Sequence, residues 1–423
     1  MTITKTINSK SCRISRGWKT IIVDFFFFFF LLFAIALPVF FESGYLRQVI
    51  MLCLSLILFI TTFRRNLVFY FSSPIVNCFL LLFVLDFISS LVLELNFFSH
   101  AFNDFINIFI ILSIFSFIKK RGMIHFSKVS VLPFLLGGPL IGLYQFFTKS
   151  FIYEGVASET QSIDILTNAM NSNTNYAALT MLASFALTLY LFLALKNPMF
   201  LFLNIISIIS VVLTYSRTAM FLMMIVILYT LFLSGLILKD KRQKRIVIIL
   251  LFLLVAIVFI NKNSISSFIG SEDFQLVMAN KKTSDFSIRI SQWVAAWKST
   301  VLGNSIKHFL FGYGDNSAKA MEYYSGYEMS AHNFIFGQLV CSGFFAFLIS
   351  SLMYLLIIWK SVKLFKTKHK AEFSFLLSCL TIIFAYLMLS IITYELILCV
   401  AIIAALVEKK GFLHETRKTC LYF

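Results

Sequence analysis

The stretch that decides the fold runs from Lys196 to Lys239: KNPMFLFLNIISIISVVLTYSRTAMFLMMIVILYTLFLSGLILK. The only charge between the two terminal lysines is Arg217, which lies in the segment TYSRTAMF at 214–221. On each side of this segment the apolar run is about 20 residues long, and a helix of that length crosses the hydrocarbon core of a bilayer. The stretch therefore predicts two membrane-spanning helices joined by a short hairpin that carries one arginine.

The composition extends this interpretation to the whole chain. Hydrophobic residues make up 60% of the sequence and charged residues only 13%, whereas about a quarter of a soluble domain is charged. Open sheets and irregular segments cannot face lipid because their backbone groups would stay unpaired, and a β-barrel would show short alternating strands instead. We predict an all-α polytopic integral membrane protein, with residues 1–423 as a single membrane domain.

Segment lengths and flanking charges predict about twelve spans. The last two come from splitting one long apolar run, so the count falls to about eleven if that run is a single helix. The predicted spans lie near residues 20–41, 45–62, 73–93, 101–118, 128–147, 176–195, 198–214, 218–238, 246–261, 333–358, 373–390 and 392–407.

Lysines and arginines test this arrangement independently, because they gather in cytoplasmic loops. With a cytoplasmic N-terminus, the short outward loops receive only Arg47, Lys149 and Arg217, and both termini are cytoplasmic. Topology also accounts for the net charge of +17, and no basic or aromatic motif favours a nucleic-acid partner. The inward loops receive Arg64, Arg65, Lys119, Lys120, Arg121, Lys196, Lys239, Lys241, Arg242, Lys244, Arg245, Lys360, Lys363, Lys366, Lys368, Lys370, Lys409 and Lys410.

Two outward segments are long, at 148–174 and 262–332, and the second has nearly balanced charges, which favours a folded loop. Within it, DFSIRISQWVAAWKSTVL (285–302) has helical spacing of Phe286, Ile290, Trp293 and Trp297. Tryptophan near a membrane edge predicts an amphipathic helix on the outer leaflet. Arg289 lies on the flank of this apolar stripe, and GYGD (312–315) predicts a turn.

The predicted topology brings three polar groups to one face at one depth: Arg217, Arg289 and His332. Each has a plainer interpretation, as a helix-end anchor, a solvated loop charge and an interfacial capping residue, respectively. Together they suit a lipid-linked diphosphate, because guanidinium groups bind phosphate through two parallel hydrogen bonds. An imidazole titrates in the range that a general base needs. Scattered cysteines and histidines show no metal-ligand spacing, so we predict no metal and no cofactor.

Several short motifs, in order, resemble a known family. They are TYSRTAMF, then RISQWVAAWK and FLFGYGDN, then AHNFIFGQLVCSGFFAFL. This order resembles the bacterial O-antigen polymerase and O-antigen ligase superfamily over roughly 170–360. In that family a Ser-Arg-Ser/Thr hairpin precedes an Arg-x3-Trp helix in a large periplasmic loop, a Gly-x-Gly turn and a His-Asn pair. The segment NSNTNYAAL (171–179) resembles the family's Asn-rich entry to a span, with Asn175 as the best match.

The resemblance implies a membrane glycosyltransferase of GT-C type architecture with a large periplasmic loop, in the bacterial inner membrane. Its donor and acceptor would be undecaprenyl-diphosphate-linked oligosaccharides at the periplasmic face, and its chemistry inverting and metal-independent. Arg217 and Arg289 would contact the diphosphate, and His332 would activate the acceptor hydroxyl or orient the donor. Membrane lipids, a chain-length regulator and a flippase are the expected partners. The supporting candidates are Ser216, Asn333, Asn175, Tyr215, Trp293, Tyr313 and Glu395.

Acidic residues also occur in predicted spans. Asp86 lies inside a span, whereas Asp24, Asp104 and Glu395 lie in or near span ends. Ionisable residues at membrane depth are functional candidates by default, and the plainer interpretation is polar bonding between helices. Asp104 and Glu395 are predicted to face outward, so either is a candidate for the site.

Three functions fit these observations. We favour a polymerase that transfers a growing glycan onto a new lipid-linked repeat unit, because polymerases diverge widely and the motif match is loose. A ligase that transfers finished glycan to lipid A-core needs the same diphosphate clamp, so the clamp cannot separate the two. A flippase is the third candidate, but transporters often carry internal repeats, and the two halves of this chain show none.

Overall fold

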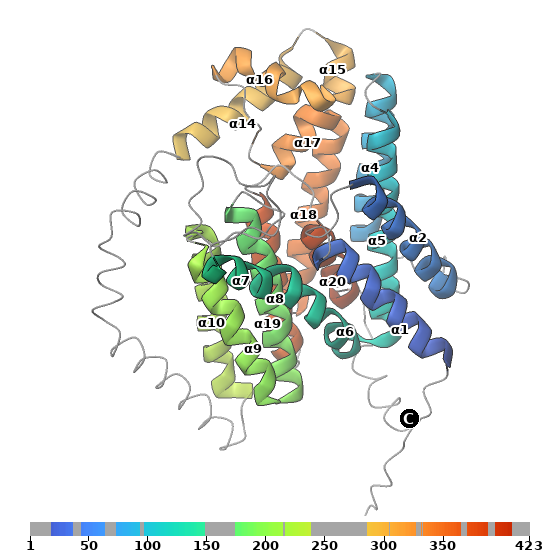
Figure 1. The fold of residues 1–423 in the computed structure, drawn as a ribbon. Coiled ribbons are helices and arrows are strands. Elements are labelled where there is room, and N and C mark those ends of the chain that lie inside the picture. Colours follow the sequence, from blue (N-terminus) through green and yellow to red (C-terminus); the bar gives the residue numbers. More distant parts are fainter. Residues whose placement is uncertain are drawn as a thin grey trace, which may run out of the picture.

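The computed structural model describes residues 18–36, 44–63, 73–93, 97–148, 174–214, 216–237, 286–303, 305–326, 331, 333–364, 370–387 and 394–407 (Figure 1). Every regular element in these ranges is a helix. The bundle consists of α1 (Trp18–Leu31), η1 (Leu32–Ala36), α2 (Gly44–Phe63), α4 (Pro74–Val92), α5 (Phe97–Arg121), α6 (Met123–Leu135), η3 (Leu136–Leu140), α7 (Ile141–Thr148), α8 (Thr174–Leu195), α9 (Pro198–Leu213), α10 (Arg217–Ile237), α18 (Phe344–Leu364), α19 (Lys370–Leu387) and α20 (Tyr394–Val407).

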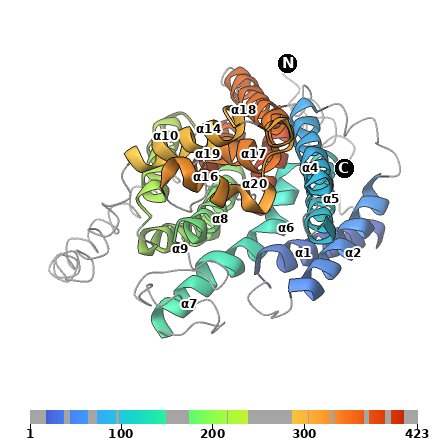
Figure 2. The ribbon, with the colours of Figure 1, turned by 90° about the horizontal axis from the view of Figure 1, so that it is seen from above.

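A second set of helices covers one end of this bundle (Figure 1). It comprises α14 (Phe286–Val301), α15 (Ile306–Phe311), η6 (Gly314–Asn316), α16 (Ser317–Ser325) and α17 (Phe334–Ser342). We call these elements the cap layer. Seen from above, they lie over the region between α10 on one side and α4 on the other (Figure 2).

The chain is an integral membrane protein with multiple membrane-spanning helices. Among the described residues, 4 helices are long and apolar enough to cross a bilayer: Pro74–Val92, Met123–Thr148, Ala177–Leu195 and Phe344–Lys363. Shorter apolar helices lie within other predicted spans, and 370–407 contains two helices that pack against each other. The predicted span 246–261 lies outside the described residues, and the total of about twelve stays a prediction.

Local sequence signals explain where several helices begin. Ser73 precedes Pro74, and its hydroxyl accepts a hydrogen bond from the Val76 amide at 3.2 Å, so α4 begins there. Asn197 precedes Pro198 in the same way and caps α9. Proline at the first helical position lacks only an N–H that has no partner in the helix, which makes it a good start signal.

The centre of the bundle is formed by α8 and α20, whose described side chains are almost all buried. Hydrogen bonds fix their neighbours: the Ser184 hydroxyl of α8 donates to the Phe134 carbonyl of α6 at 2.7 Å. The Asn204 amide of α9 donates to the Phe185 carbonyl at 2.9 Å and to the Thr188 hydroxyl at 3.0 Å. The helix that precedes the predicted hairpin at Arg217, α9, is thus anchored to the core.

The predicted span 333–358 is wrong as a single helix. The structure has α17 and α18, with a break at Gly343, where φ is +90°. A Cβ at Gly343 would lie 2.1 Å from the carbonyl oxygen of Leu310, and a Cβ at Gly312 (φ +72°) would lie 2.4 Å from that of Cys341. The turn after α15 and the break after α17 therefore touch backbone to backbone, and only glycine fits at either position.

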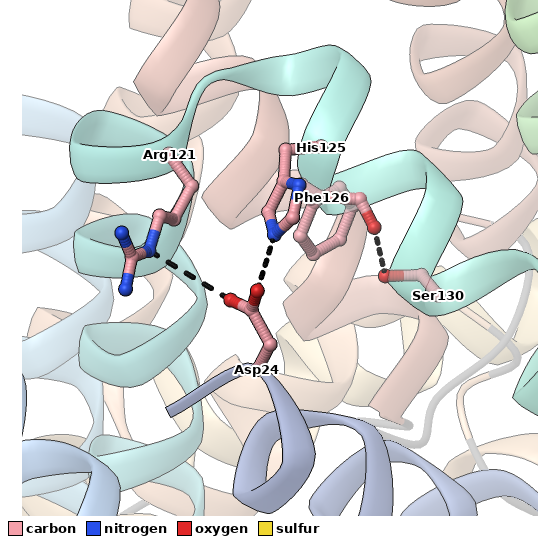
Figure 3. Close-up of polar contacts among 5 residues, drawn as sticks. All are labelled: Asp24, Arg121, His125, Phe126 and Ser130. Carbon is pink, nitrogen blue, oxygen red and sulfur yellow. Dashed lines mark hydrogen bonds and ion pairs between the residues drawn. The ribbon is translucent and has the colours of Figure 1, made fainter. Parts of the chain in front are cut away.

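A polar cluster ties α1 to the turn between α5 and α6 (Figure 3). The Asp24 carboxylate lies 2.9 Å from Nε2 of His125 and 3.7 Å from Nε of Arg121. Phe117 stacks on both Phe27 and His125, so aromatic rings flank the cluster. Asp24 thus bonds helices together, which is the plainer of its two predicted roles, and all three polar residues are predicted to lie on the cytoplasmic side.

We expect Asp24→Ala to lower the stability of the protein by about 1–3 kcal/mol, because it leaves a poorly solvated Arg121 and His125 without their carboxylate. The measurement is the thermal unfolding midpoint of the purified protein in detergent. Lys128→Ala, which removes an exposed cation from the same helix as His125, is the control. Equal midpoints for the two variants would contradict a bonding role for Asp24.

We expect Gly343→Ala to destabilise the protein more than Gly326→Ala. Both glycines have positive φ, but a Cβ at Gly326 (φ +74°) meets nothing within 4 Å. The control therefore carries only the backbone strain, about 1–3 kcal/mol, whereas Gly343→Ala adds the clash with Leu310. The readouts are the unfolding midpoint and the yield of monodisperse protein, and similar losses in both variants would rule out the tight backbone contact.

Candidate functional site

The predicted helix at 285–302 is present as α14, and it packs against α16 and α17. Trp293 stacks on Phe336 of α17, with ring centroids 5.9 Å apart and an interplanar angle of 7°. Trp297 meets Phe347 of α18 edge to face. Small side chains allow this close approach. The buried residues Ala295, Ala296, Met321, Ala331 and Val340 form one apolar cluster between these elements.

The opposite side of α14 presents an apolar row to the outside. Ile290 is 42% exposed, Val294 44% and Trp297 37%. The exposed row differs from the predicted stripe, because the small residues face the protein and Trp293 is drawn toward α17. Three exposed apolar side chains in a row are what a helix needs to lie on a membrane surface.

Arg289 lies in the first turn of α14 with a partly exposed side chain. Within the described ranges, no carboxylate forms an ion pair with it. It precedes Ala296 by seven residues, so it lies on the same helix face about 10 Å along the axis. This is the face that packs toward Ala331.

His332 lies outside the described residues, but its neighbours on both sides are described. Ala331 is buried in the cluster with Ala295 and Ala296 of α14. The Asn333 side chain caps α17, where its Oδ1 accepts hydrogen bonds from the amides of Ile335 at 2.9 Å and Phe336 at 3.2 Å. Asn333 therefore has a structural role, and Ala331 packs beside α14.

Arg217 is the first residue of α10, and its side chain lies outside the described part of the structure. Ser216, next to it, is buried, and its hydroxyl accepts from the Ala219 amide at 3.4 Å, which makes it the cap of α10. The amide of Ser216 in turn donates to the Thr214 hydroxyl at 3.3 Å. Tyr215 is outside the described residues. In both ribbon views α14 lies over α10 (Figures 1 and 2).

Tyr313 holds the cap layer together. Its hydroxyl donates to the Ser299 carbonyl at 2.9 Å and its amide to the Val340 carbonyl at 2.7 Å. Its ring stacks on His308, with centroids 4.1 Å apart. Burial raises the pKa of the Tyr313 phenol, and the neighbouring Tyr324 raises it further. These contacts join α14, α15 and α17, so Tyr313, one of the supporting candidates, has a structural role in the cap layer.

The other supporting candidates are placed only in part. Asn175 and Glu395 lie in the first turns of α8 and α20, and their side chains are outside the described residues.

The sequence analysis did not predict the residues that join the cap layer to α4. Among them, the Ser89 hydroxyl bonds the Phe311 carbonyl and lies 3.4 Å from the Cys341 carbonyl. Across the described ranges, no three His, Cys, Asp or Glu side chains form a metal-binding group.

Comparison with known proteins identifies the central segment of the chain. A family model described as O-antigen ligase matches residues 201–351. The matched segment begins in α9 and ends in α18, so it contains the hairpin at Arg217, the helix with Arg289 and the position of His332. No curated protein matches the chain. Over residues 201–351 the chain is therefore similar to the O-antigen ligase family, whose members are membrane enzymes that transfer glycans.

Proposed function

We propose that this protein is an O-antigen polymerase that transfers an undecaprenyl-diphosphate-linked glycan onto a lipid-linked repeat unit at the periplasmic face of the inner membrane. The observation that carries the proposal is the packing of α14, with Arg289, against α17 and Ala331. This packing brings the helix that carries Arg289 against Ala331, the residue before His332, within the segment that matches a glycan-transferring family.

The proposed chemistry is a single displacement at the anomeric carbon of the donor glycan. His332 accepts the proton of the acceptor hydroxyl, whose oxygen forms the new bond to that carbon. The bond to the diphosphate oxygen breaks on the opposite side, which inverts the configuration. Arg217 and Arg289 balance the charge that develops on the leaving diphosphate, and a positioned charge of this kind acts most strongly in a site with little water.

The exposed apolar row of α14 supports a lipid-linked substrate. Its helix exposes the apolar row of Ile290, Val294 and Trp297, and we infer that this row lies on the outer leaflet. A helix in that position holds a flanking arginine near the level of lipid headgroups, which is where the diphosphate of a polyprenyl carrier lies.

The contacts of the polar cluster at Asp24 support the proposed orientation. Asp24, Arg121 and His125 come from three different helices, and the charge pattern predicts all three on the cytoplasmic side. The cap layer lies at the other end of the bundle from α6's first turn (Figure 1). With the cluster on the cytoplasmic side, as the charge pattern predicts, we propose that the cap layer lies on the periplasmic side.

The second candidate is an O-antigen ligase, and the description of the matched family model favours it. Both enzymes release the same diphosphate and need the same clamp. They differ in the acceptor, which is a lipid-linked repeat unit for a polymerase and lipid A-core for a ligase.

We expect Arg217→Ala, Arg289→Ala and His332→Ala each to lower glycan transfer by at least about 10²-fold, because each removes a group that acts in the transition state. Arg→Lys at either position should also impair transfer, since an ammonium group cannot form the paired hydrogen bonds. The measurement is polymer formation in cells that lack the chromosomal gene, normalised to the amount of membrane-inserted protein.

Lys298→Ala is the matched control for Arg289→Ala, because Lys298 is an exposed cation on the same helix. It should leave transfer unchanged. Wild-type polymer from the three alanine variants of Arg217, Arg289 and His332 would exclude the diphosphate clamp.

Deletion of the gene separates the two candidate functions. For a polymerase, we expect surface lipid A-core that carries a single repeat unit, because ligation continues without polymerisation. A ligase instead predicts bare core together with accumulated lipid-linked polymer. Gel electrophoresis of the surface polysaccharide and analysis of the lipid extract distinguish these results, and an unchanged ladder would contradict both.

A further inference from the structure

Asp86 is the one charged residue in α4, which is a candidate membrane span. A carboxylate within a span costs about 2.5–3.5 kcal/mol on insertion scales. Such residues are therefore retained for a partner or a function. The glycan-transfer chemistry proposed above does not use Asp86.

Asp86 bonds the cap layer. Its Oδ1 accepts a hydrogen bond from the hydroxyl of Ser342, the last residue of α17. Ser89, one turn further along the same face of α4, bonds the Phe311 carbonyl at the end of α15 and lies near the Cys341 carbonyl. Two polar side chains of one helix thus contact the ends of two helices in the cap layer.

The buried face of α4 changes from apolar to polar along the length of the helix. Its first part buries Val76, Phe79 and Phe83, which pack in the apolar core. Asp86 and the buried Ser90 continue the same face at helical spacing. The face becomes polar where α4 meets α15 and α17, so this end of the helix is built to bond the cap layer rather than lipid.

The bonded helix, α17, connects the proposed site to the bundle. It is 9 residues long, which corresponds to a rod of about 13 Å. Ser342 is at one end, and Asn333, which follows His332, is the cap at the other. Between them, Phe336 stacks on Trp293 of the helix that carries Arg289. A shift at Ser342 would therefore move both parts of the proposed site.

We infer that Asp86 is a positioning residue: through the hydrogen bond from Ser342 it fixes α17, and with α17 the segment of His332 and the helix of Arg289. The inference rests on the proposed glycan transfer for its functional part. A displacement of about 1 Å at a reacting group can lower a rate by about 10²-fold. Loss of this bond is therefore expected to lower kcat rather than substrate binding.

The kinetic test uses purified full-length protein and, as substrate, the lipid extract from membranes of the deletion strain. We expect Asp86→Ala to lower kcat by about 10–100-fold with KM within about twofold of wild type. Asp86→Asn keeps the acceptor oxygen and should retain most of kcat. Ser342→Ala should match Asp86→Ala, and the double variant should be no slower, because the two groups act as one unit.

Ser130→Ala, which removes a buried hydroxyl that donates to the Phe126 carbonyl within α6 at 2.8 Å, is the control and should behave as wild type. The inference is overturned if Asp86→Ala retains wild-type kcat, if Asp86→Asn loses as much as Asp86→Ala, or if KM rises while kcat stays constant.

Hydrogen exchange tests the same bond without relying on activity. In Asp86→Ala and Ser342→Ala, amides of residues 334–342 should exchange faster, while those of 177–195 in α8 should exchange as in wild type. Unchanged exchange at 334–342 would overturn the inference. If the wild type forms no polymer from the lipid extract, the proposed polymerase function fails, and the exchange result still decides whether Asp86 fixes α17.

Discussion

The backbone contact between 310–312 and 341–343 is the constraint on which the cap layer depends. A break in a helix at the edge of a bilayer leaves carbonyl and amide groups without helical partners, and lipid offers none. Here Tyr313 donates its amide to the Val340 carbonyl, and Ser89 reaches the Phe311 and Cys341 carbonyls. The irregular backbone is thus satisfied by protein, which is the condition under which membrane proteins tolerate it.

Most helices could be predicted from the sequence because the signals that form them are local. Apolar runs and their lysine flanks mark spans, and the pairs Ser73–Pro74 and Asn197–Pro198 mark starts. The break at Gly343 could not be predicted in this way, because CSGFF reads as the continuation of an apolar helix. The break brings Gly343 against the carbonyl of Leu310, more than thirty residues earlier, and such a contact has no local signature.

The candidate site also has one feature that the sequence predicted and one that it did not. Helical periodicity predicted α14 and placed Arg289 near its start, but it did not predict which face packs on the protein. In water the larger apolar side chains would be buried, whereas next to lipid they gain little by facing inward. Close packing then favours small residues at the interface, so Ala295 and Ala296 face the protein and Ile290 and Val294 face outward.

The same reasoning explains why polar side chains recur at the helix contacts that position the site. An apolar side chain gains nearly the same energy from contact with lipid as from contact with another helix, so apolar contacts alone do not fix how two helices are aligned along each other. A hydrogen bond does, because it is directional and costly to leave unmade in hydrocarbon. Asn204 fixes α9, and with it the hairpin of Arg217, to α8, whereas Ser342 fixes α17 to Asp86. Each part of the proposed clamp is therefore located by a different polar bond to the bundle.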